Sequence, residues 1–204
     1  MRKGDDGHVK NNSTFQWDDA SLIETKVSSE LIYDGKVIHV YRDEISLPNG
    51  QPSMRELIRH NGAVCVIPLT AENEVICVRQ YRYAVGQVLL EIPAGKLDTR
   101  EEDPTSAALR ELREETGAHC GKLTYLGKYL GSPALLDECI YMYMAEDLSF
   151  GETDFDEDEF LDIVRIPLSE LVEAVLVGEI SDGKTQAAVM RAAWMRGLSR
   201  GGSL

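Results

Sequence analysis

Three glutamates crowd the end of a segment that should form a short helix. Glu111, Glu114 and Glu115 are spaced i, i+3 and i+4, so they share one side of the helix. They lie just before Gly117, near the helix C-terminus, where the helix dipole disfavours negative charge. A sequence that breaks a local stability rule in this way marks a candidate functional site. A hard divalent cation, Mg²⁺ where phosphates are also present, is the simplest compensation for the clustered carboxylates.

Local signals define the helix that must position these glutamates. Asp103 is expected to cap its N-terminus, Pro104 suits its first position, and Gly117 marks its end. Arg110 lies four residues before Glu114, where an intrahelical ion pair can orient that carboxylate. A charge run on a helix is most often only a solvated face. The residues that mark the helix ends and the placement of the charges favour a functional site over a solvated face.

The segment from Gly95 to Ala118, GKLDTREEDPTSAALRELREETGA, resembles the Nudix box, G-x5-E-x7-R-E-U-x-E-E-x-G-U with U an aliphatic residue. Its second half matches without a gap, with Ala118 as a small substitute for the last aliphatic residue. The first half departs from the pattern. Glu102 fits the count back from Arg110, whereas Glu101 fits the count forward from Gly95. If Glu102 is the first glutamate of the box, one extra residue in the loop after Gly95 explains the difference from the pattern. The choice between Glu101 and Glu102 stays open.

The resemblance implies a Mg²⁺-dependent hydrolase of a diphosphate bond, with Mn²⁺ as the alternative ion. It implies an α/β (α+β) architecture, the Nudix fold, in which a mixed β-sheet lies between helices and an N-terminal β-strand subdomain is added. From about residue 24 to 197 the chain looks like bacterial ADP-ribose pyrophosphatases, through LPNG, MREL, VRQYR, EIPAGKLD, GSPALLDE and DEDEF. The implied reaction converts ADP-ribose to AMP and ribose 5-phosphate.

Individual roles also follow from the resemblance. The implied metal ligands are the Ala94 carbonyl, Glu111, Glu115 and Glu159. Glu157 is the implied general base, Glu138 is its main rival, and Glu114 is a further catalytic carboxylate. The implied substrate contacts are Arg55, Arg82, Lys96, Ser132, Pro133, Ala134, Val37 and Ile38. On composition alone, the acidic run DFDEDE at 154–159 is a solvated loop and single arginines are surface residues, so these roles depend on the family match.

Two other functions stay open. The family usually has glycine where this chain has Ala134, and a smaller residue where Leu135 and Leu136 stand. These differences concern the terminal sugar, and hydrolysis of another nucleoside diphosphate sugar such as GDP-mannose is the alternative. A Nudix-fold sensor that binds its ligand without turnover would not need the box carboxylates, so their presence disfavours that third reading.

Composition and charge exclude several classes. The chain has 204 residues, enough for one sizeable core, and its net charge of -14 argues against binding a nucleic-acid backbone. No apolar run approaches membrane-spanning length, and the N-terminus lacks an apolar signal core. The four cysteines have no CxxC or zinc spacing and fall mostly in apolar stretches. Buried, reduced thiols and a cytoplasmic location are therefore expected.

The chain divides into four predicted parts. Residues 1–20 are expected to be disordered, 21–60 to form N-terminal strands, 61–197 to form the Nudix hydrolase domain, and 198–204 to be a tail. Strands are predicted at 25–47 with a turn at Asp34-Gly35, and at 54–60, 62–70, 74–82, 89–95, 122–130 and 138–148, and later helices begin at Ser169 and Asp182. By resemblance, the N-terminal strands pack against a second copy of the chain, giving a homodimer in which each copy completes the other's substrate site.

Overall fold

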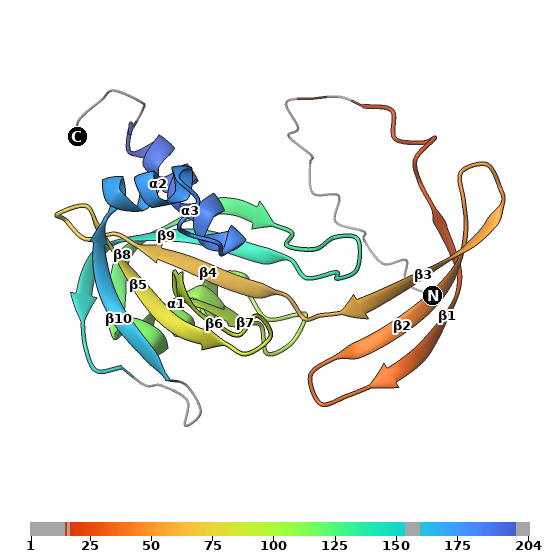
Figure 1. The fold of residues 1–204 in the computed structure, drawn as a ribbon, viewed down its shortest axis with the longest axis horizontal. Helices are drawn as coiled ribbons and strands as arrows, with labels where there is room; N and C mark the ends of the chain where they lie inside the picture. Colours follow the sequence, from red (N-terminus) through yellow and green to blue (C-terminus); the bar gives the residue numbers. More distant parts are fainter. Residues whose placement is uncertain (1–14, 16, 154–159, 199–204) are drawn as a thin grey trace, which may run out of the picture.

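The computed structural model describes residue 15 and residues 17–153 and 160–198 (Figure 1). Most of the segment 1–20, nearly all of the tail, and the expected base Glu157 and metal ligand Glu159 lie outside the described residues. A body of sheets and helices carries a separate N-terminal sheet that projects from one side (Figure 1). Within the described ranges, none of the helices combines the length and apolar character needed to cross a membrane.

The elements follow one another in an order that mixes strands and helices. They are β1 (Thr25–Asp34), β2 (His39–Ser46), β3 (Pro52–Arg59), β4 (Ala63–Pro68), β5 (Glu74–Arg82), β6 (Gln87–Glu91), β7 (Ala94–Lys96), α1 (Pro104–Thr116), β8 (Ala118–Tyr129), β9 (Ile140–Phe150), β10 (Leu161–Pro167), α2 (Leu168–Leu176) and α3 (Gly183–Met195). They form three sheets, ordered β1-β2-β3, β10-β5-β6 and β7-β4-β9-β8. In the last sheet β4 and β9 are parallel, while the other pairs are antiparallel, so this sheet is mixed.

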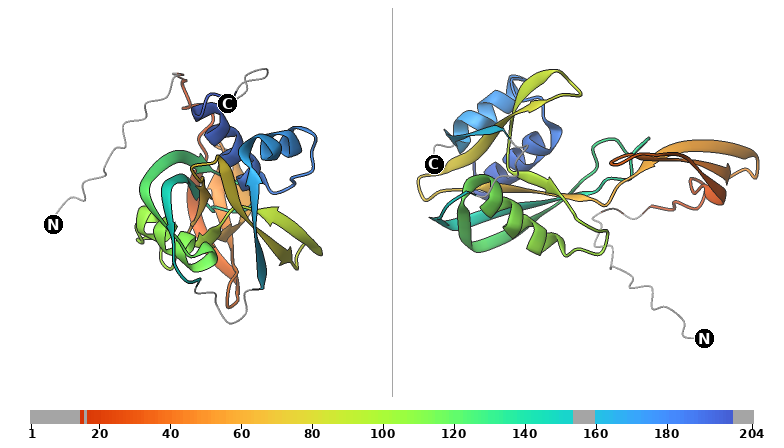
Figure 2. Two further views of the ribbon diagram at one scale, coloured as in Figure 1. Left: turned by 90° about the vertical axis from the view of Figure 1, so that its left-hand side faces the viewer. Right: turned by 90° about the horizontal axis from the view of Figure 1, so that it is seen from below.

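Strand β4 contributes to a hydrophobic core on each face of its sheet. Its residues are buried on both faces, so it is apolar throughout instead of alternating with polar residues. Val64 and Val66 pack with Leu112 of α1, whereas Cys65 and Ile67 face the opposite core, to which α2 and α3 contribute. Figure 2 shows α1 on one side of this sheet and α2 and α3 on the other. The predicted arrangement of a mixed sheet between helices is confirmed.

Helix α1 has the ends that its sequence predicts. The Asp103 carboxylate accepts a hydrogen bond from the backbone N–H of Ser106 at 3.0 Å, and Pro104 occupies the first helical position. Gly117 ends the helix with φ +66°, and its N–H donates to the Arg113 carbonyl at 2.8 Å. A left-handed residue at this position favours glycine. The N-cap and the glycine at the C-terminus define the two ends of α1. They therefore determine the direction in which the glutamates of its last two turns point.

Two strand and helix boundaries differ from the prediction. The segment 89–95 is not one strand, because β6 pairs with β5 and β7 pairs with β4 in a different sheet. Pro93 lies between them; it has no N–H for a ladder, and its carbonyl accepts from Val66 at 2.9 Å. Helix α2 begins at Leu168 and not at a Ser169 cap, and Pro167 precedes it without a side-chain capping bond. Pro167 itself is the last residue of β10, so the strand runs directly into the helix.

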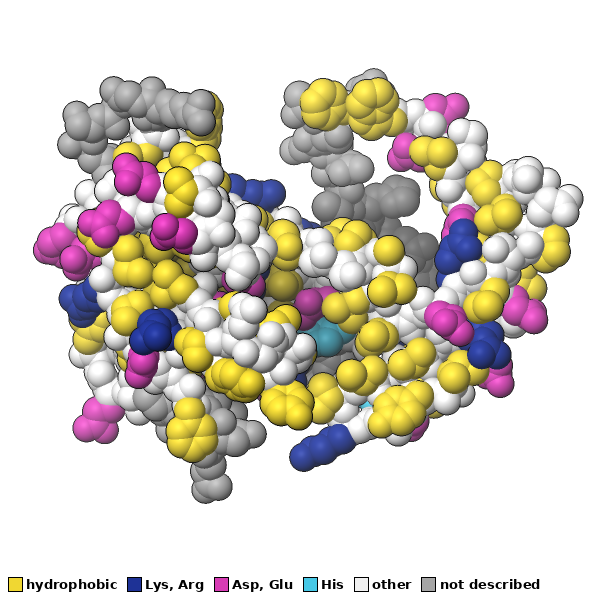
Figure 3. Space-filling view, in the orientation of Figure 1, with side chains coloured by type: hydrophobic (Ala, Val, Ile, Leu, Met, Phe, Trp, Pro, Cys, Tyr) yellow, Lys and Arg dark blue, Asp and Glu magenta, His cyan; other side chains and the backbone are white. Residues whose placement is uncertain are grey.

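The N-terminal sheet is mostly exposed. The predicted hairpin is confirmed: the Gly35 N–H donates to the Ile38 carbonyl at 2.9 Å between β1 and β2. Every residue of β1 is exposed, including Val27 at 67% and Tyr33 at 60% of the residue's reference area. Figure 3 shows hydrophobic side chains spread over this sheet on the face toward the viewer. Apolar residues are therefore exposed along the length of β1.

Candidate active site

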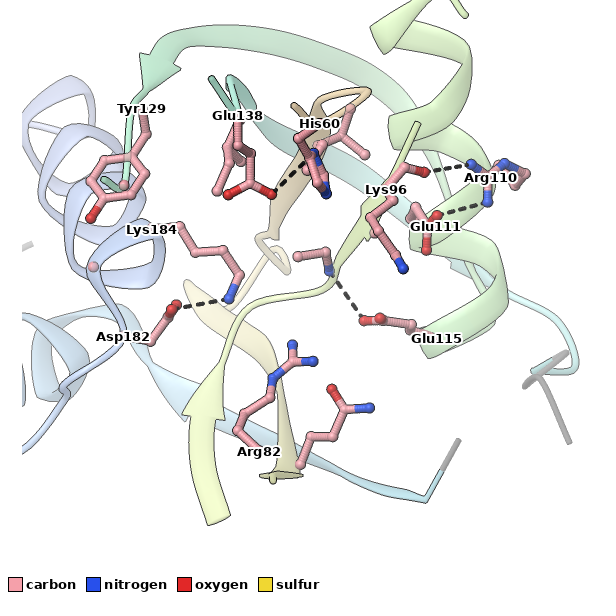
Figure 4. A pocket seen from close by; sticks show the side chains of 18 of the residues that line it. His60, Arg82, Lys96, Arg110, Glu111, Glu115, Tyr129, Glu138, Asp182 and Lys184 are labelled. Carbon is pink, nitrogen blue, oxygen red and sulfur yellow. Dashed lines mark hydrogen bonds and ion pairs between the residues drawn. The ribbon is translucent and has the colours of Figure 1, made fainter. Parts of the chain in front are cut away.

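A pocket of about 630 Å³ lies between helix α1 with strand β7 and the start of helix α3 (Figure 4). Seven of the residues expected from the sequence line it: Arg82, Ala94, Lys96, Glu111, Glu114, Glu115 and Glu138. Polar and charged side chains form much of the wall, and they come from segments that lie far apart in the sequence, between His60 and Lys184. A concave site with convergent charged groups is where ligand binding is expected.

The box glutamates form one wall of the pocket. Glu111 and Glu115 are only 8% and 4% exposed. Arg110 Nη1 lies 2.7 Å from Glu111 Oε1 and 3.3 Å from Glu114 Oε2, which confirms the predicted pair between Arg110 and Glu114. Burial would lower the pKa of Arg110, but Glu111, Glu102 and their neighbours raise it, so the guanidinium is held in its charged form. Arg110 thus binds the carboxylates together at the helix end.

The loop before β7 is shaped to receive these carboxylates. The Ala94 N–H donates to Glu115 Oε2 at 3.3 Å. A Cβ built on Gly95 would lie 2.0 Å from Glu111 Cδ, closer than real Cβ contacts allow. Only glycine at this position lets Glu111 lie against the strand. The first glycine of the box is therefore a packing requirement of the carboxylate wall.

Glu102, and not Glu101, is the loop glutamate tied to the site. Its Oε2 accepts from the Asp98 N–H at 2.6 Å, and its Oε1 lies 3.4 Å from Arg110 Nη2. Glu101 is exposed. The single inserted residue thus lies in the loop between β7 and α1. It does not disturb the contact between Arg110 and Glu102.

The opposite wall centres on a buried carboxylate that the sequence interpretation missed. Glu91, 1% exposed, accepts two hydrogen bonds from Arg82, Nε to Oε1 at 2.7 Å and Nη2 to Oε2 at 2.8 Å. Lys184 at the start of α3 also donates to Glu91 and lies 3.0 Å from Asp182. Burial would raise the pKa of Glu91, but the hydrogen bond from Arg82 and the charge of Lys184 lower it below its ordinary value. Glu91 is therefore an ionised anchor for two cations.

A third group of residues joins the pocket to the N-terminal sheet. Glu138 Oε1 lies 3.5 Å from Nδ1 of His60, a residue to which the sequence interpretation assigned no chemistry. The neighbouring Asp137 accepts from the His60 N–H at 2.6 Å and pairs with Arg100 at 2.8 Å. These contacts hold the loop that carries Glu138 against the end of β3. Neither His60 nor Lys184 belongs to a motif that can be recognised from residue spacing. Only the tertiary structure shows that they line the pocket.

The other expected contacts are not among the residues that line this pocket. Arg55 is on β3, where its Nε donates to Glu24 at 3.0 Å. Val37 and Ile38 are exposed in the β1–β2 turn, and Ser132, Pro133 and Ala134 form an exposed turn beside the pocket residue Gly131. Within one chain, the structure therefore does not bring these substrate contacts together with the box helix.

The donor chemistry of the pocket fits a hard divalent cation. Two nearly buried carboxylates, Glu111 and Glu115, adjoin the backbone at Ala94, and oxygen donors of this kind suit such ions. The described side chains do not converge into a tight group of three or more His, Cys, Asp or Glu. The Glu111 carboxylate pairs with Arg110 at 2.7 Å. The acidic segment 154–159 lies outside the described residues.

The thiols lie outside the pocket. Cys65 and Cys77 are buried, Cys120 and Cys139 are half-buried, and all four are free. Burial raises the pKa of Cys65 and Cys77 to about 12. The expectation of reduced thiols is consistent with these positions.

Comparison with protein families identifies two regions. The family model described as the NUDIX domain matches residues 59–188, and one described as the nucleoside diphosphate sugar hydrolase N-terminal domain matches residues 24–58. Together these two matches run from the start of the N-terminal sheet to helix α3.

Curated relatives and a solved structure cover most of the chain. The chain is 44% identical over 168 residues to a methanol dehydrogenase activator from Bacillus methanolicus, covering 81% of this chain and 90% of that one. It is 42% identical over 171 residues to an ADP-ribose pyrophosphatase from Bacillus subtilis, covering 83% and 92%. A GDP-mannose pyrophosphatase from Escherichia coli is 30% identical over 183 residues, covering 81% and 90%. A crystal structure of an ADP compounds hydrolase superposes with a TM-score of 0.77 at 26% identity, covering 88% and 98%.

Proposed function

Because this chain belongs to the Nudix family of hydrolases, we propose that it cleaves ADP-ribose to AMP and ribose 5-phosphate with the help of a divalent metal ion. One observation carries the proposal: the nearly buried Glu111 and Glu115 face a pocket whose other wall holds Arg82 and Lys184. Carboxylates on one side and fixed cations on the other suit a diphosphate that binds together with a metal.

We propose Mg²⁺ as the ion, with Mn²⁺ as the alternative. Glu111, Glu115 and the Ala94 carbonyl would hold it, joined by Glu159 from the acidic segment. When bound, such an ion neutralises phosphate charge and activates water. Arg110 orients Glu111 and Glu114 through the contacts at 2.7 and 3.3 Å. Lys96, at the end of β7, supplies a further positive charge to the pocket.

The base that takes the proton from water is assigned to Glu157, with Glu138 as the competing candidate. Glu138 lines the pocket, and its Oε1 lies 3.5 Å from Nδ1 of His60. The His60 Nδ1 also accepts a hydrogen bond from the Gly62 N–H at 3.0 Å.

A turnover panel tests this function and its alternative. ADP-ribose, GDP-mannose and UDP-glucose would each be incubated with the protein and Mg²⁺, and the products identified by chromatography. We expect ADP-ribose to give the highest kcat/KM. A preference for GDP-mannose, the substrate named for the Escherichia coli relative, would move the assignment to that sugar. No turnover of any of the three would favour a sensor that binds without hydrolysis.

We further propose that the chain acts as a homodimer through its N-terminal sheet. The exposed apolar residues of β1, such as Val27 and Tyr33, support an interface there. In the proposed dimer, Arg55, Val37 and Ile38 of one copy would contact the substrate in the other copy.

Cross-complementation tests this arrangement. Arg55→Ala and Glu115→Gln should each retain at most about a tenth of the parent activity alone, whereas their 1:1 mixture, unfolded and refolded together, should reach about a quarter of it. Light scattering gives the mass of each preparation. If the mixture stays inactive although it is dimeric, Arg55 serves its own chain. If the mass is that of a monomer, the dimer is wrong.

The protein is also proposed to work in the cytoplasm. Its four cysteines are free, and reduced thiols of this kind are typical of a reducing compartment. Cell fractionation with an antibody to the chain would test this location.

A further inference from the structure

A single carboxylate, Asp137, connects three segments near the pocket. It precedes Glu138 in the loop between β8 and β9, and its Oδ1 accepts from the His60 N–H at 2.6 Å. Its Oδ2 accepts from Arg100 at 2.8 Å and lies 3.5 Å from Arg59 Nη1. Arg59 ends β3, and Arg100 lies in the loop between β7 and α1. Asp137 therefore joins its own loop both to the N-terminal sheet and to the loop before the box helix.

The backbone is held on both sides of Glu138. Before it, the Asp137 N–H donates to the Ile58 carbonyl at 3.2 Å. After it, the Cys139 carbonyl accepts from the Ala63 N–H at 3.0 Å. The Glu138 side chain lines the pocket, whereas Asp137 is not among the lining residues. Asp137 can therefore act on a bound ligand only through a neighbour, and Glu138 is the neighbour in its own loop.

The Glu138 carboxylate suits one kind of ligand group. Its side chain is 21% exposed, and Oε1 lies 3.5 Å from His60 Nδ1 at the edge of the pocket (Figure 4). An ionised carboxylate accepts hydrogen bonds and donates none. Phosphate oxygens are also negatively charged acceptors, so they repel it. The matching group on a nucleoside diphosphate sugar is a sugar hydroxyl, and a hydrogen bond to it is lost if the carboxylate moves by about 1 Å.

The charges around Asp137 favour its ionised form. Burial would raise the pKa of Asp137, but the hydrogen bonds from Arg100 and from the His60 N–H lower it below its ordinary value. Arg59 is held in turn by Asp43 of β2, which is 3.5 Å away and only 6% exposed. The position of Asp137 is thus set from the N-terminal sheet as well as from the loop before α1.

We propose that Asp137 is a positioning residue for substrate binding: it holds Glu138 where that carboxylate accepts a hydrogen bond from a sugar hydroxyl of the ligand. The inference rests on the proposed function for its ligand class, a nucleoside diphosphate sugar. A purely structural aspartate would affect ligand binding to the same degree with or without the Glu138 side chain. A positioning residue loses its effect when that side chain is removed.

A double-mutant cycle measured by binding separates these two roles without depending on turnover. Calorimetric titration with ADP-ribose in Ca²⁺ buffer would give the Kd of the parent, Asp137→Asn, Glu138→Ala and the double variant. GDP-mannose replaces ADP-ribose if the parent does not bind ADP-ribose. Arg100→Gln, alone and with Glu138→Ala, weakens the same contact from outside the loop, which keeps the test available if Asp137→Asn does not fold. Thermal unfolding verifies that each variant is folded.

Two matched controls come from an ion pair outside the pocket. Arg79 and Asp162 pair at 3.1 Å, and neither lines the pocket. The Arg79 side chain is 50% exposed, against 49% for Arg100, so Arg79→Gln removes an arginine of equal exposure. Asp162→Asn removes the corresponding carboxylate. The Kd for the sugar nucleotide should not change in either control.

We expect Asp137→Asn to raise the Kd about tenfold. Arg100→Gln should raise it about threefold, because solvent screens this half-exposed pair. Loss of a negative charge would by itself favour an anionic ligand, so a rise in Kd reports a displaced side chain. In the Glu138→Ala background, both substitutions should change the Kd by less than about twofold.

Equal fold-changes in the two backgrounds would overturn the inference, because Asp137 would then act without Glu138. An unchanged Kd in Asp137→Asn would overturn it as well, as would a parent that binds neither sugar nucleotide. A parent that shows the expected cycle but hydrolyses nothing would leave the positioning role standing and remove the proposed activity alone.

Discussion

The carboxylate of Glu111 lies directly over the Cα of Gly95, so that a Cβ there would be 2.0 Å from Glu111 Cδ. Gly95→Ala should therefore displace the Glu111 side chain while the helix and strand stay folded, because the end of a glutamate can rotate away. We expect kcat to fall by about a hundredfold or more, with a small change in melting temperature. Gly151→Ala is the control, since its nearest contact would be an ordinary 3.7 Å. Equal loss in both variants would contradict this explanation.

Glu115→Gln tests the role of the most buried box carboxylate. The amide keeps the side-chain volume and an oxygen that can accept from the Ala94 N–H, but it removes one negative charge. We expect kcat with Mg²⁺ to fall at least about tenfold. The melting temperature should hold or rise, because a negative charge near the helix C-terminus is gone. Steady-state kinetics and calorimetry measure both. Activity equal to that of the exposed control Glu101→Gln would remove Glu115 from the metal site.

The end of α1 allows a sharper test of stability. Gly117 has φ +66°, and a Cβ there would also lie 2.6 Å from the Gly151 carbonyl oxygen. Gly178 has φ +82° but open space around it. Gly178→Ala should cost about 1 kcal/mol of unfolding free energy for the backbone conformation alone. Gly117→Ala should cost more, because it adds a steric clash. Urea denaturation measures the difference, and equal losses would mean that the contact with Gly151 relaxes freely.

Acid should weaken the group around Glu91. The pKa of Glu91 is lower in the folded protein than its ordinary value of 4.5. The stability that the ionised carboxylate provides is therefore complete above about pH 4.5 and is lost as the pH falls through the lower folded pKa. Glu91→Gln should cost about 3–5 kcal/mol at pH 7, since it leaves buried cations without their partner.

The gap in unfolding free energy between parent and Glu91→Gln should then narrow as the pH drops below 4.5. Asp162→Asn is the control, because its pair with Arg79 at 3.1 Å is exposed and should contribute less than about 1 kcal/mol. Denaturation at several pH values gives the comparison. A gap that does not change with pH would show that Glu91 is not ionised in the folded protein.

The choice of general base can be decided by two matched variants. Glu157→Gln should lower kcat by about a hundredfold or more and leave metal binding intact, because only the proton acceptor is removed. Glu138→Gln should mainly change KM if Glu138 contacts substrate. The pH dependence of kcat separates the two, since loss of the base removes its acidic limb. If that limb disappears only in Glu138→Gln, the base is Glu138.

The sequence by itself determined the chemistry of one wall of the site. The spacing of Glu111, Glu114 and Glu115, the cap at Asp103 and the stop at Gly117 are local features, set by the helix period and by the bonds of neighbouring residues. They predicted the position of α1, its ends and the face that bears the carboxylates, and the family resemblance that followed from them is confirmed by the matched NUDIX domain.

Tertiary structure alone decided the opposite wall. Glu91 and Lys184 are 93 residues apart, and neither has a local pattern that distinguishes it from an ordinary surface charge. Their pairing depends on the packing of α3 against the β-sheet, which is a long-range outcome of burial. The same holds for His60 beside Glu138, and for the split between β6 and β7, where Pro93 lets the chain change sheets. The spacing of residues along the sequence determines which side chains share a helix face. Which side chains lie across the cavity from that face depends on how the whole chain packs.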